Sequence, residues 1–321
     1  MSVRQRAGLG AEKSSRSGGP WVTHAALLVV QFAFASQAVE AKLVMLPRAQ
    51  GGEEIAPEAL AMMRMTAAAL VFQSLVRVRR ARAQPIATAD HARLVGLSIV
   101  GIALNQALFL MGLRWTTPFA TALIGATIPI FAAGLAVLFR KETLSWRTVV
   151  GVALGMSGVL SLIGLGKLDR GAVLVALNSL SYAAYVVLSR DVVLRVGALR
   201  TVAWVFTYGA LLFAPLGVSP MIATVPALSP RAWGLVLYIL AVPTIVAYLL
   251  NAWALARSSA TLVTIYIYLQ PLLAALLAWV QLGMGISSRA WLAAGLILSG
   301  LGVVISRRAV KAPSASSEGQ S

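Results

Sequence analysis

Amide and phenol side chains inside long apolar stretches are the residues of this sequence that could bind a solute. The stretches are long enough to cross a membrane, where a polar side chain must find a partner or cavity water. Such residues near the estimated mid-depth are expected to line one substrate cavity, and a hydrogen bond that merely bridges two helices is the alternative for each. The expected substrate-binding residues are Gln37, Gln106, Tyr182, Tyr248 and Gln270, with Asn105 and Asn178 behind them.

Three charged residues also lie within the apolar stretches. Glu40 could relay protons or balance a cationic substrate, although it is within about two turns of the predicted outer end of its helix. Lys42 cannot share a helical face with Glu40, because positions i and i+2 point apart, so it is expected to extend toward the interface. Arg64 could pair with Glu40 or with helix-end carbonyls. A packing or topological role for Arg64 is favoured over substrate binding, with coupling or gating as the functional alternative.

Glu142 follows the fourth apolar stretch and comes directly after Arg140 and Lys141. These three residues are expected to form a charge cluster that fixes the loop at a cytoplasmic helix end. An inner gate built on Glu142 is the alternative.

The sequence contains few residues that could catalyse a reaction. The chain has two histidines, His24 and His91, and no cysteine, and its acidic residues lie mostly in loops. No HExxH motif, phosphate-binding loop or convergent His/Asp set is present in the sequence. We therefore expect no enzyme activity, no metal site, no cofactor and no use of ATP.

The composition is that of an integral membrane protein. Hydrophobic residues make up 59% of the 321 residues, charged residues make up 12%, and the mean hydropathy is +0.83. The net charge of +17 comes from basic residues in the connections between apolar stretches, so topology explains it better than a nucleic-acid partner does. The apolar run after the basic N-terminus is longer than a signal-peptide core of about 7–15 residues and is expected to be retained as a span.

The fold predicted from the hydropathy pattern is all-α, with ten transmembrane helices. If the N-terminus is cytoplasmic, most of the 27 Lys and Arg residues fall on the inner side, which is the positive-inside pattern. Both termini are then cytoplasmic, and a plasma (inner) membrane location is expected. The predicted spans are 22–46, 57–78, 94–115, 118–139, 148–166, 171–193, 201–219, 233–256, 261–283 and 290–306.

An internal duplication appears when the sequence is shifted by 142 positions. Pro129 then falls on Pro271, and the matches continue through the next span, which indicates two copies of a five-helix unit. An odd number of spans inverts the second copy, as in many secondary transporters with a midplane substrate site. Each proline is expected to kink its helix and free a carbonyl near mid-membrane. Further matched pairs are Ser145 with Ser287, Arg147 with Arg289, Ser157 with Ser299 and Gly158 with Gly300.

The sequence resembles the drug/metabolite transporter superfamily, specifically its EamA-type members with two five-helix repeats. The resemblance covers about residues 24–306. It departs from the family pattern at Gln281-Leu-Gly-Met284, where Leu-Gly-Glu is usual, and at Phe34, where Trp is frequent. It is carried by Lys42, by Pro57 and Arg64 in PEALAMMRMTAAAL, by Pro129, Glu142, Ser145 and Gly151, by LNSLSYAAYVVLSR ending in Arg190, and by Pro271, Ser287 and Gly300.

The inverted repeat predicts a secondary transporter that moves a small organic solute, metabolite or amino-acid-like, by alternating access. Export is what the resemblance implies. A facilitative channel or an uptake carrier of the same fold is the alternative, followed by an intramembrane enzyme. Close helix packing is expected at the Gly151/Gly155 and Gly295/Ser299 pairs, with a homodimer contact as the alternative. The expected partners are a small-molecule solute and the lipid bilayer.

The expected domain organisation follows the repeats. A disordered basic cytoplasmic N-terminus (1–21) precedes the first five-helix repeat (22–166). The second repeat (171–306) is followed by a disordered cytoplasmic C-terminus (307–321).

Overall fold

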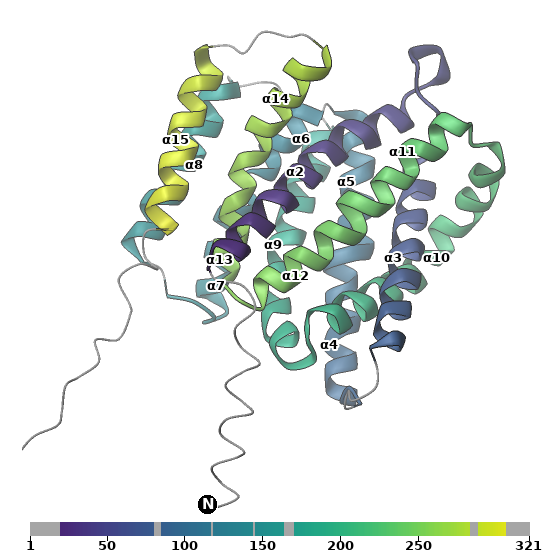
Figure 1. Cartoon of the computed structure of the whole chain (residues 1–321), viewed down its shortest axis with the longest axis horizontal. Coiled ribbons are helices and arrows are strands. Elements are labelled where there is room, and N and C mark those ends of the chain that lie inside the picture. The colour runs from purple at the N-terminus through teal and green to yellow at the C-terminus, as the bar shows by residue number, and fades with distance from the viewer. Residues whose placement is uncertain are drawn as a thin grey trace, which may run out of the picture.

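A computed structural model describes residues 20–79, 85–116, 118–143, 145–163, 170–282 and 288–305. Within these ranges the secondary structure is helical and contains no strand (Figure 1). The expected terminal segments lie outside the described residues, except for residues 20 and 21, which begin the first helix. Met284 and Ser287 also lie outside the described residues.

Six helices or helix pairs are long and apolar enough to cross a membrane within the described ranges. Shorter apolar helices accompany them, and each predicted range overlaps a helix or helix pair. The third span, predicted from residue 94, begins at Thr88. The seventh span, predicted as 201–219, is longer at both ends. It is a helix of 27 residues that continues through Pro215 and Pro220. The long segments are α2 (Pro20–Met45), α3 (Pro57–Val78), α4 (Thr88–Ser98) with α5 (Leu104–Trp115), α9 (Arg170–Val196), α10 (Ala198–Thr224), and α11 (Pro230–Leu240) with α12 (Ala247–Leu255).

The shorter helices recur with the spacing found in the sequence. The helix α8 (Trp146–Ile163) and the helix α15 (Ser288–Ile305) begin and end 142 residues apart. A broken pair precedes each of them in the chain, and in the first half it is made of α6 (Pro118–Gly125) and α7 (Ile128–Leu138). The second pair is α13 (Ala260–Ile265), a 3-10 turn at Tyr266–Tyr268, and α14 (Leu269–Leu282).

A π-helical turn interrupts one long helix in each half at the same relative position. The turn at Ile99–Ala103 joins α4 to α5, and the turn at Ala241–Val246 joins α11 to α12. The two turns begin 142 residues apart. π-Turns are rare and often lie at functional sites. Their recurrence therefore indicates that this part of each half belongs to a functional site.

Each proline lies in the first turn of a helix that follows an interruption, so the kink expected at Pro129 and Pro271 takes the form of an irregular turn just before the proline. The chain leaves α6 at Gly125, and Pro129 is the second residue of α7. Pro271 is the third residue of α14, directly after the 3-10 turn. The first turn of a helix suits proline because the backbone N–H that it lacks has no intrahelical partner there.

Corresponding helices of the two halves pack against each other. The helix α3 runs along α10, and α8 runs along α15 (Figure 1). The first helix of each half packs on the other half, since α2 contacts α12 and α14 whereas α9 contacts α5 and α7. The halves are therefore interlocked around a shared centre.

Glycine permits the close approach of α8 and α15. A Cβ atom on Gly300 would lie 2.6 Å from the carbonyl oxygen of Gly151 and 3.0 Å from the amide nitrogen of Gly155. The Gly151/Gly155 pair thus serves intramolecular packing. Gly295 makes no such close approach within the chain, because a Cβ there would meet open space, and the homodimer alternative for this pair stays a prediction.

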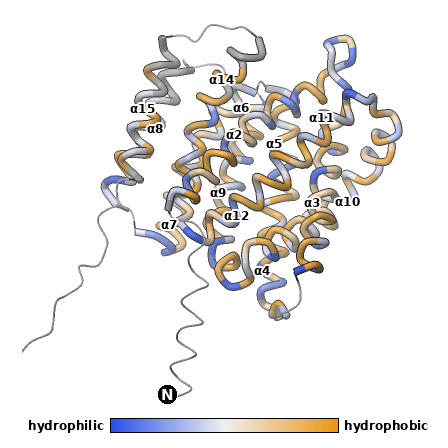
Figure 2. Tube along the Cα trace, viewed as in Figure 1, coloured by the Kyte–Doolittle hydropathy of each residue, from blue (hydrophilic) through white to orange (hydrophobic). Residues whose placement is uncertain are grey.

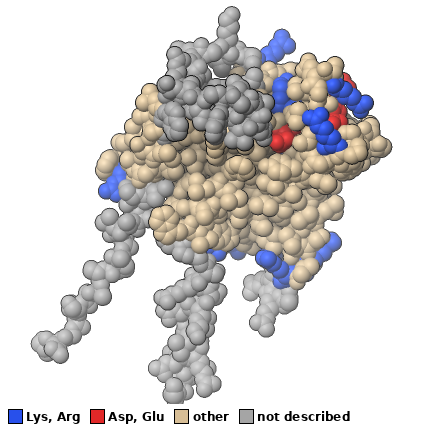
Figure 3. All heavy atoms as spheres, turned by 45° about the horizontal axis from the view of Figure 1, so that its top comes forward, with Lys and Arg blue, Asp and Glu red and all other residues tan. Residues whose placement is uncertain are grey.

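The surface suits a bilayer. Figure 2 shows apolar segments along the length of the helices, and Figure 3 shows Lys, Arg, Asp and Glu gathered toward the two ends with other residues between them. Large apolar side chains are exposed on the outer helices, among them Leu28, Leu70, Leu211 and Leu216. So large an exposed apolar surface is expected where lipid covers it.

Candidate functional site

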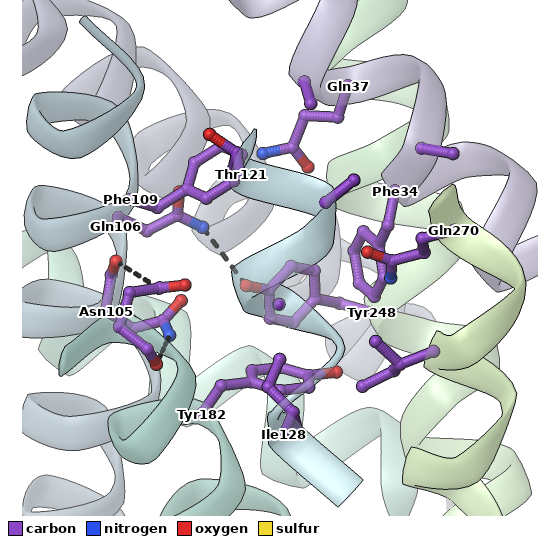
Figure 4. A pocket seen from close by; sticks show the side chains of 16 residues that line it. Phe34, Gln37, Asn105, Gln106, Phe109, Thr121, Ile128, Tyr182, Tyr248 and Gln270 are labelled. Carbon is purple, nitrogen blue, oxygen red and sulfur yellow. Dashed lines mark hydrogen bonds between the residues drawn. The ribbon is translucent and has the colours of Figure 1, made fainter. Parts of the chain in front are cut away.

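A cavity of about 80 Å³ lies at the centre of the interlocked helices. Its walls come from α2, α5, α6 and α7 of the first half and from α9, α12, the 3-10 turn and α14 of the second (Figure 4). All seven expected substrate-binding residues line it: Gln37, Asn105, Gln106, Asn178, Tyr182, Tyr248 and Gln270. Their role in binding a substrate stays a prediction.

Gln106 and Tyr248 join the two halves across this cavity. The Gln106 Nε2 donates to the Tyr248 hydroxyl at 3.2 Å, and the two residues are 142 positions apart. Residues related by a pseudo-two-fold axis touch each other when both lie close to that axis. The bond therefore marks the place where the equivalent helices α5 and α12 meet.

Arg64 lies directly behind this pair and is 1% exposed. Its Nη1 donates to the Gln106 Oε1, its Nη2 donates to the Gln37 Oε1 at 3.0 Å, and its Nε donates to the Thr244 Oγ1 at 2.8 Å. Thr244 belongs to the second π-turn. The guanidinium thus binds three neutral oxygens, and its expected pairing with Glu40 or with helix-end carbonyls is wrong.

Asn105 and Asn178 hold α5 and α9 together at the cavity wall. The Asn178 Nδ2 donates to the Asn105 carbonyl oxygen at 2.9 Å, and the Asn105 Nδ2 donates to the Asn178 carbonyl oxygen at 3.3 Å. Figure 4 shows dashed bonds at Asn105. Each asparagine therefore bridges helices and lines the cavity, so the two expected roles coexist here.

Aromatic rings pack beneath the amides. Phe34 meets the ring of Tyr248 edge-on at 5.7 Å between centroids and the ring of Tyr182 at 6.3 Å, and Phe206 meets Tyr248 at 4.9 Å. The Asn251 Nδ2 donates to the Tyr182 hydroxyl at 3.1 Å. These contacts fix both phenols, because each ring is packed and each oxygen is bonded.

Sequence reasoning missed several residues of this site. Thr121 and Phe109 line the cavity, and Asn251 holds Tyr182 from one helical turn beyond Tyr248. The spacing of Tyr248 and Asn251, i and i+3 on one helix face, is a signal that could have found Asn251. Thr121 lies in the short α6 and offers no comparable pattern.

The acidic candidates lie apart from the cavity. Glu40 is half-buried on α2, and within the described ranges its carboxylate makes no hydrogen bond or ion pair. Glu142 accepts from the amide nitrogen of Ala260 at 2.8 Å and from the Thr261 hydroxyl at 2.7 Å, so it caps α13. The expected charge cluster with Arg140 and Lys141 is wrong for Glu142, and Lys141 pairs instead with Asp191.

Lys42 does not extend outward as expected. Its Nζ donates to the carbonyl oxygens of Leu113, Arg114 and Thr116 at 2.8–2.9 Å, and it thereby caps the C-terminal end of α5. A cation suits this position because the last carbonyls of a helix lack intrahelical partners.

Comparison with known proteins supports a transporter. The sequence is 27% identical over 255 residues to an uncharacterized inner membrane transporter, YedA, of Escherichia coli K12, covering 77% of this chain and 81% of YedA. It is 31% identical over 218 residues to the uncharacterized transporter YwfM of Bacillus subtilis, covering 66% of this chain and 72% of YwfM. A transporter of Archaeoglobus fulgidus, also uncharacterized, is 26% identical over 239 residues, which is 72% of this chain and 82% of its own length.

A solved crystal structure has the same fold. It matches with a TM-score of 0.70 and covers 91% of this chain and 100% of its own, at 18% sequence identity. The fold and the relatives together define a multi-pass membrane transporter. The EamA-like transporter family matches twice, over residues 22–164 and 169–306. The chain belongs to this family, which is part of the drug/metabolite transporter superfamily.

Proposed function

We propose that this protein exports a small organic solute across the plasma membrane by alternating access, through the cavity between two inverted five-helix repeats. The observation that carries the proposal is the Gln106–Tyr248 bond, which joins equivalent helices of the two halves at the cavity wall. Secondary transporters with inverted repeats bind substrate at such an interface. The cavity residues Gln37, Asn105, Asn178, Tyr182 and Gln270 complete the proposed site.

Two equivalent helix caps support the inverted arrangement. Lys42 bonds the Thr116 carbonyl oxygen at 2.8 Å, and Arg190 bonds the Ser258 carbonyl oxygen through Nε at 3.0 Å. The two acceptors are 142 residues apart. Each cation lies in the C-terminal part of the first helix of its half and caps the third, so an inversion puts one cap at each membrane face. Ten spans with both termini cytoplasmic complete this topology.

Contacts between the halves support a closed gate at the proposed cytoplasmic end. Glu142 caps α13, Lys141 pairs with Asp191, and Arg195 bonds Asp90 at 2.9 Å. Each bond joins the first half to the second, so the halves cannot separate at this end without breaking them. In this proposal Glu142 is a gate residue.

Glu40 is the proposed coupling group. It is half-buried one turn beyond Gln37, and its carboxylate has no bonded partner among the described residues. Proton coupling through Glu40 predicts that Glu40→Gln changes transport or its pH dependence. Unchanged transport at every pH would remove Glu40 from the mechanism.

The test compares metabolites released by cells that make equal amounts of the wild type and of Gln106→Ala/Tyr248→Ala. Gln73→Ala/Tyr208→Ala is a matched control, since it removes the same side-chain types from α3 and α10 outside the cavity. The proposal predicts solutes that accumulate outside with the wild type and the control but not with the cavity variant. Identical profiles from all three strains would contradict export. Uptake of labelled solute into vesicles would then favour an uptake carrier of the same fold.

A further inference from the structure

The buried charge of Arg64 has no counterion among the residues that the structure describes. Its guanidinium donates to Thr244, Gln106 and Gln37, all through neutral oxygens, and Arg64 takes part in none of the ion pairs formed by the described residues. Removing a guanidinium from water is costly, and neutral acceptors satisfy its N–H groups without cancelling its charge. An anion close to this site would be favoured.

Gln37 and Gln106 connect the Arg64 guanidinium to the cavity through hydrogen bonds. Arg64 holds the oxygens of Gln37 and Gln106, so their NH₂ groups are turned away from it. The Gln106 NH₂ donates to the Tyr248 oxygen, which leaves the Tyr248 hydroxyl proton to be donated onward. The Gln37 NH₂ has no acceptor among the described residues. In Figure 4 these three side chains lie around the same space.

Three other amides of the cavity present acceptors instead. Asn105 and Asn178 each use their NH₂ group on the backbone of the other, and the Gln270 NH₂ donates to the Gln31 Oε1 at 2.7 Å. The side-chain oxygens of these three residues are therefore left to accept. The cavity thus has donors on the side backed by Arg64. On the side of α9 and α14 it has the three amide oxygens together with the Tyr182 hydroxyl, which accepts from Asn251 and can donate its proton.

We propose that the transported solute carries one carboxylate, which binds the Gln37 NH₂ and the Tyr248 hydroxyl and neutralises Arg64; this inference rests on the proposed function. A single guanidinium matches a single negative charge. Two donor groups match the two oxygens of a carboxylate better than the three oxygens and higher charge of a phosphate. The acceptor side then receives an ammonium or hydroxyl group of the same solute. Arg64 acts through the glutamines and is a positioning residue for them.

The test uses liposomes that contain the purified full-length protein and are loaded with matched solutes. The carboxylates are L-serine, L-leucine, L-phenylalanine and lactate, each paired with its primary amide, and glycerol phosphate is added as a phosphate probe. Release is measured by mass spectrometry against protein-free liposomes. We expect at least one carboxylate to leave at least about tenfold faster than its amide, a ratio that corresponds to about 1.4 kcal/mol. Glycerol phosphate should stay inside.

Variants then connect the preference to Arg64. Arg64→Lys keeps the charge and should keep a preference for the carboxylate, whereas Arg64→Gln should bring the two rates to within about twofold. The wild-type comparison stands by itself if Arg64→Gln fails to fold. Amides released as fast as their carboxylates, or faster release of glycerol phosphate, would overturn the carboxylate site and leave transport established. Release of no solute at all would contradict the transport function as well.

Discussion

Tyr248 combines two separable interactions in one side chain. Its ring packs between Phe34 and Phe206, at 5.7 and 4.9 Å between centroids, and its hydroxyl accepts from Gln106. The ring contacts stabilise the fold through buried apolar area, whereas the hydroxyl is the polar group that joins the halves. Removing the hydroxyl alone should therefore separate transport from stability.

Tyr248→Phe is expected to reduce transport at least about tenfold while the amount of protein in the membrane stays unchanged. The lost hydrogen bond should cost about 1 kcal/mol of unfolding free energy, measured as thermal unfolding in detergent. Tyr185→Phe is the matched control, because that hydroxyl has no hydrogen bond among the described residues and does not line the cavity. Equal transport by the two variants would remove Tyr248 from the substrate site.

At this scale the sequence identified positions but not partners. Asn105, Gln106 and Asn178 were found because a polar residue in an apolar helix is rare and needs a partner. The neighbours of Arg64 could not be predicted. They come from α2, α5 and the second π-turn, and they depend on how these helices pack rather than on spacing along the chain.

At the scale of elements, the turn after α7 positions the cap of α13. Arg140 adopts a φ of 53°, a left-handed conformation that few residues with side chains adopt. The backbone amides of Lys141 and Glu142 then bond back to the Ala136 carbonyl oxygen. This turn aims the Glu142 carboxylate at the N-terminal amides of α13, where a negative charge is favoured.

Glu142→Gln should weaken that cap by about 1 kcal/mol, because the amide keeps the shape but loses the charge. Thermal unfolding in detergent measures the loss, and transport assays should show an altered rate at an unchanged protein level. Glu54→Gln, in an exposed loop, should change neither quantity. A parallel fall in protein level and transport would show that Glu142 serves folding and not gating.

The contact of α8 with α15 allows a second test at this scale. Gly300→Ala should cost about 1–3 kcal/mol, because its methyl group would lie 2.6 Å from the Gly151 carbonyl oxygen and force the helices apart. Gly295→Ala in the same helix should be neutral or slightly stabilising, since its methyl group meets open space. Equal unfolding temperatures for the two variants would show that α8 and α15 do not pack through Gly300.

The duplication was visible in the sequence because it preserves residues such as Pro129 and Pro271 at one offset. The breaks that these prolines mark were predicted as kinks, since proline removes the same backbone donor in either arrangement. The π-turns at Ile99–Ala103 and Ala241–Val246 were not predicted; Pro243 lies in the second turn, but the first contains no proline. They arise from one extra residue within a helical turn, which changes no residue type that a pattern can detect.

For the whole molecule, the distribution of basic residues predicted a membrane orientation that labelling can test. The chain has no cysteine, so a thiol-reactive label modifies only the single cysteine that is introduced. Glu54→Cys, between α2 and α3, should react with a membrane-impermeant maleimide on intact cells. Ala92→Cys, near the start of α4, should react after the membrane is permeabilised and not before. The opposite pattern would reverse the orientation and, with it, the end at which Glu142 acts.

The helical membrane fold and the two-repeat organisation followed from hydropathy and self-similarity, because both depend on composition and period alone. The interlocking of the halves did not, since α2 packs on α12 and α14 of the second half through contacts distant in sequence. The cavity forms because helices of each half pack against the other half. Its residues could be predicted individually from the sequence, but only the packing of the helices brings them together.

The central claim is that the solute occupies the cavity between the halves, and protection of a cavity thiol from labelling tests it most directly. Thr121→Cys lines the cavity, and Ala92→Cys lies outside it. The solutes released by the wild type are added to each purified variant during reaction with a small water-soluble maleimide. Our account predicts that a transported solute slows labelling of Thr121→Cys in a concentration-dependent way and leaves Ala92→Cys unchanged. An unchanged labelling rate for Thr121→Cys at a saturating concentration of a transported solute would contradict it.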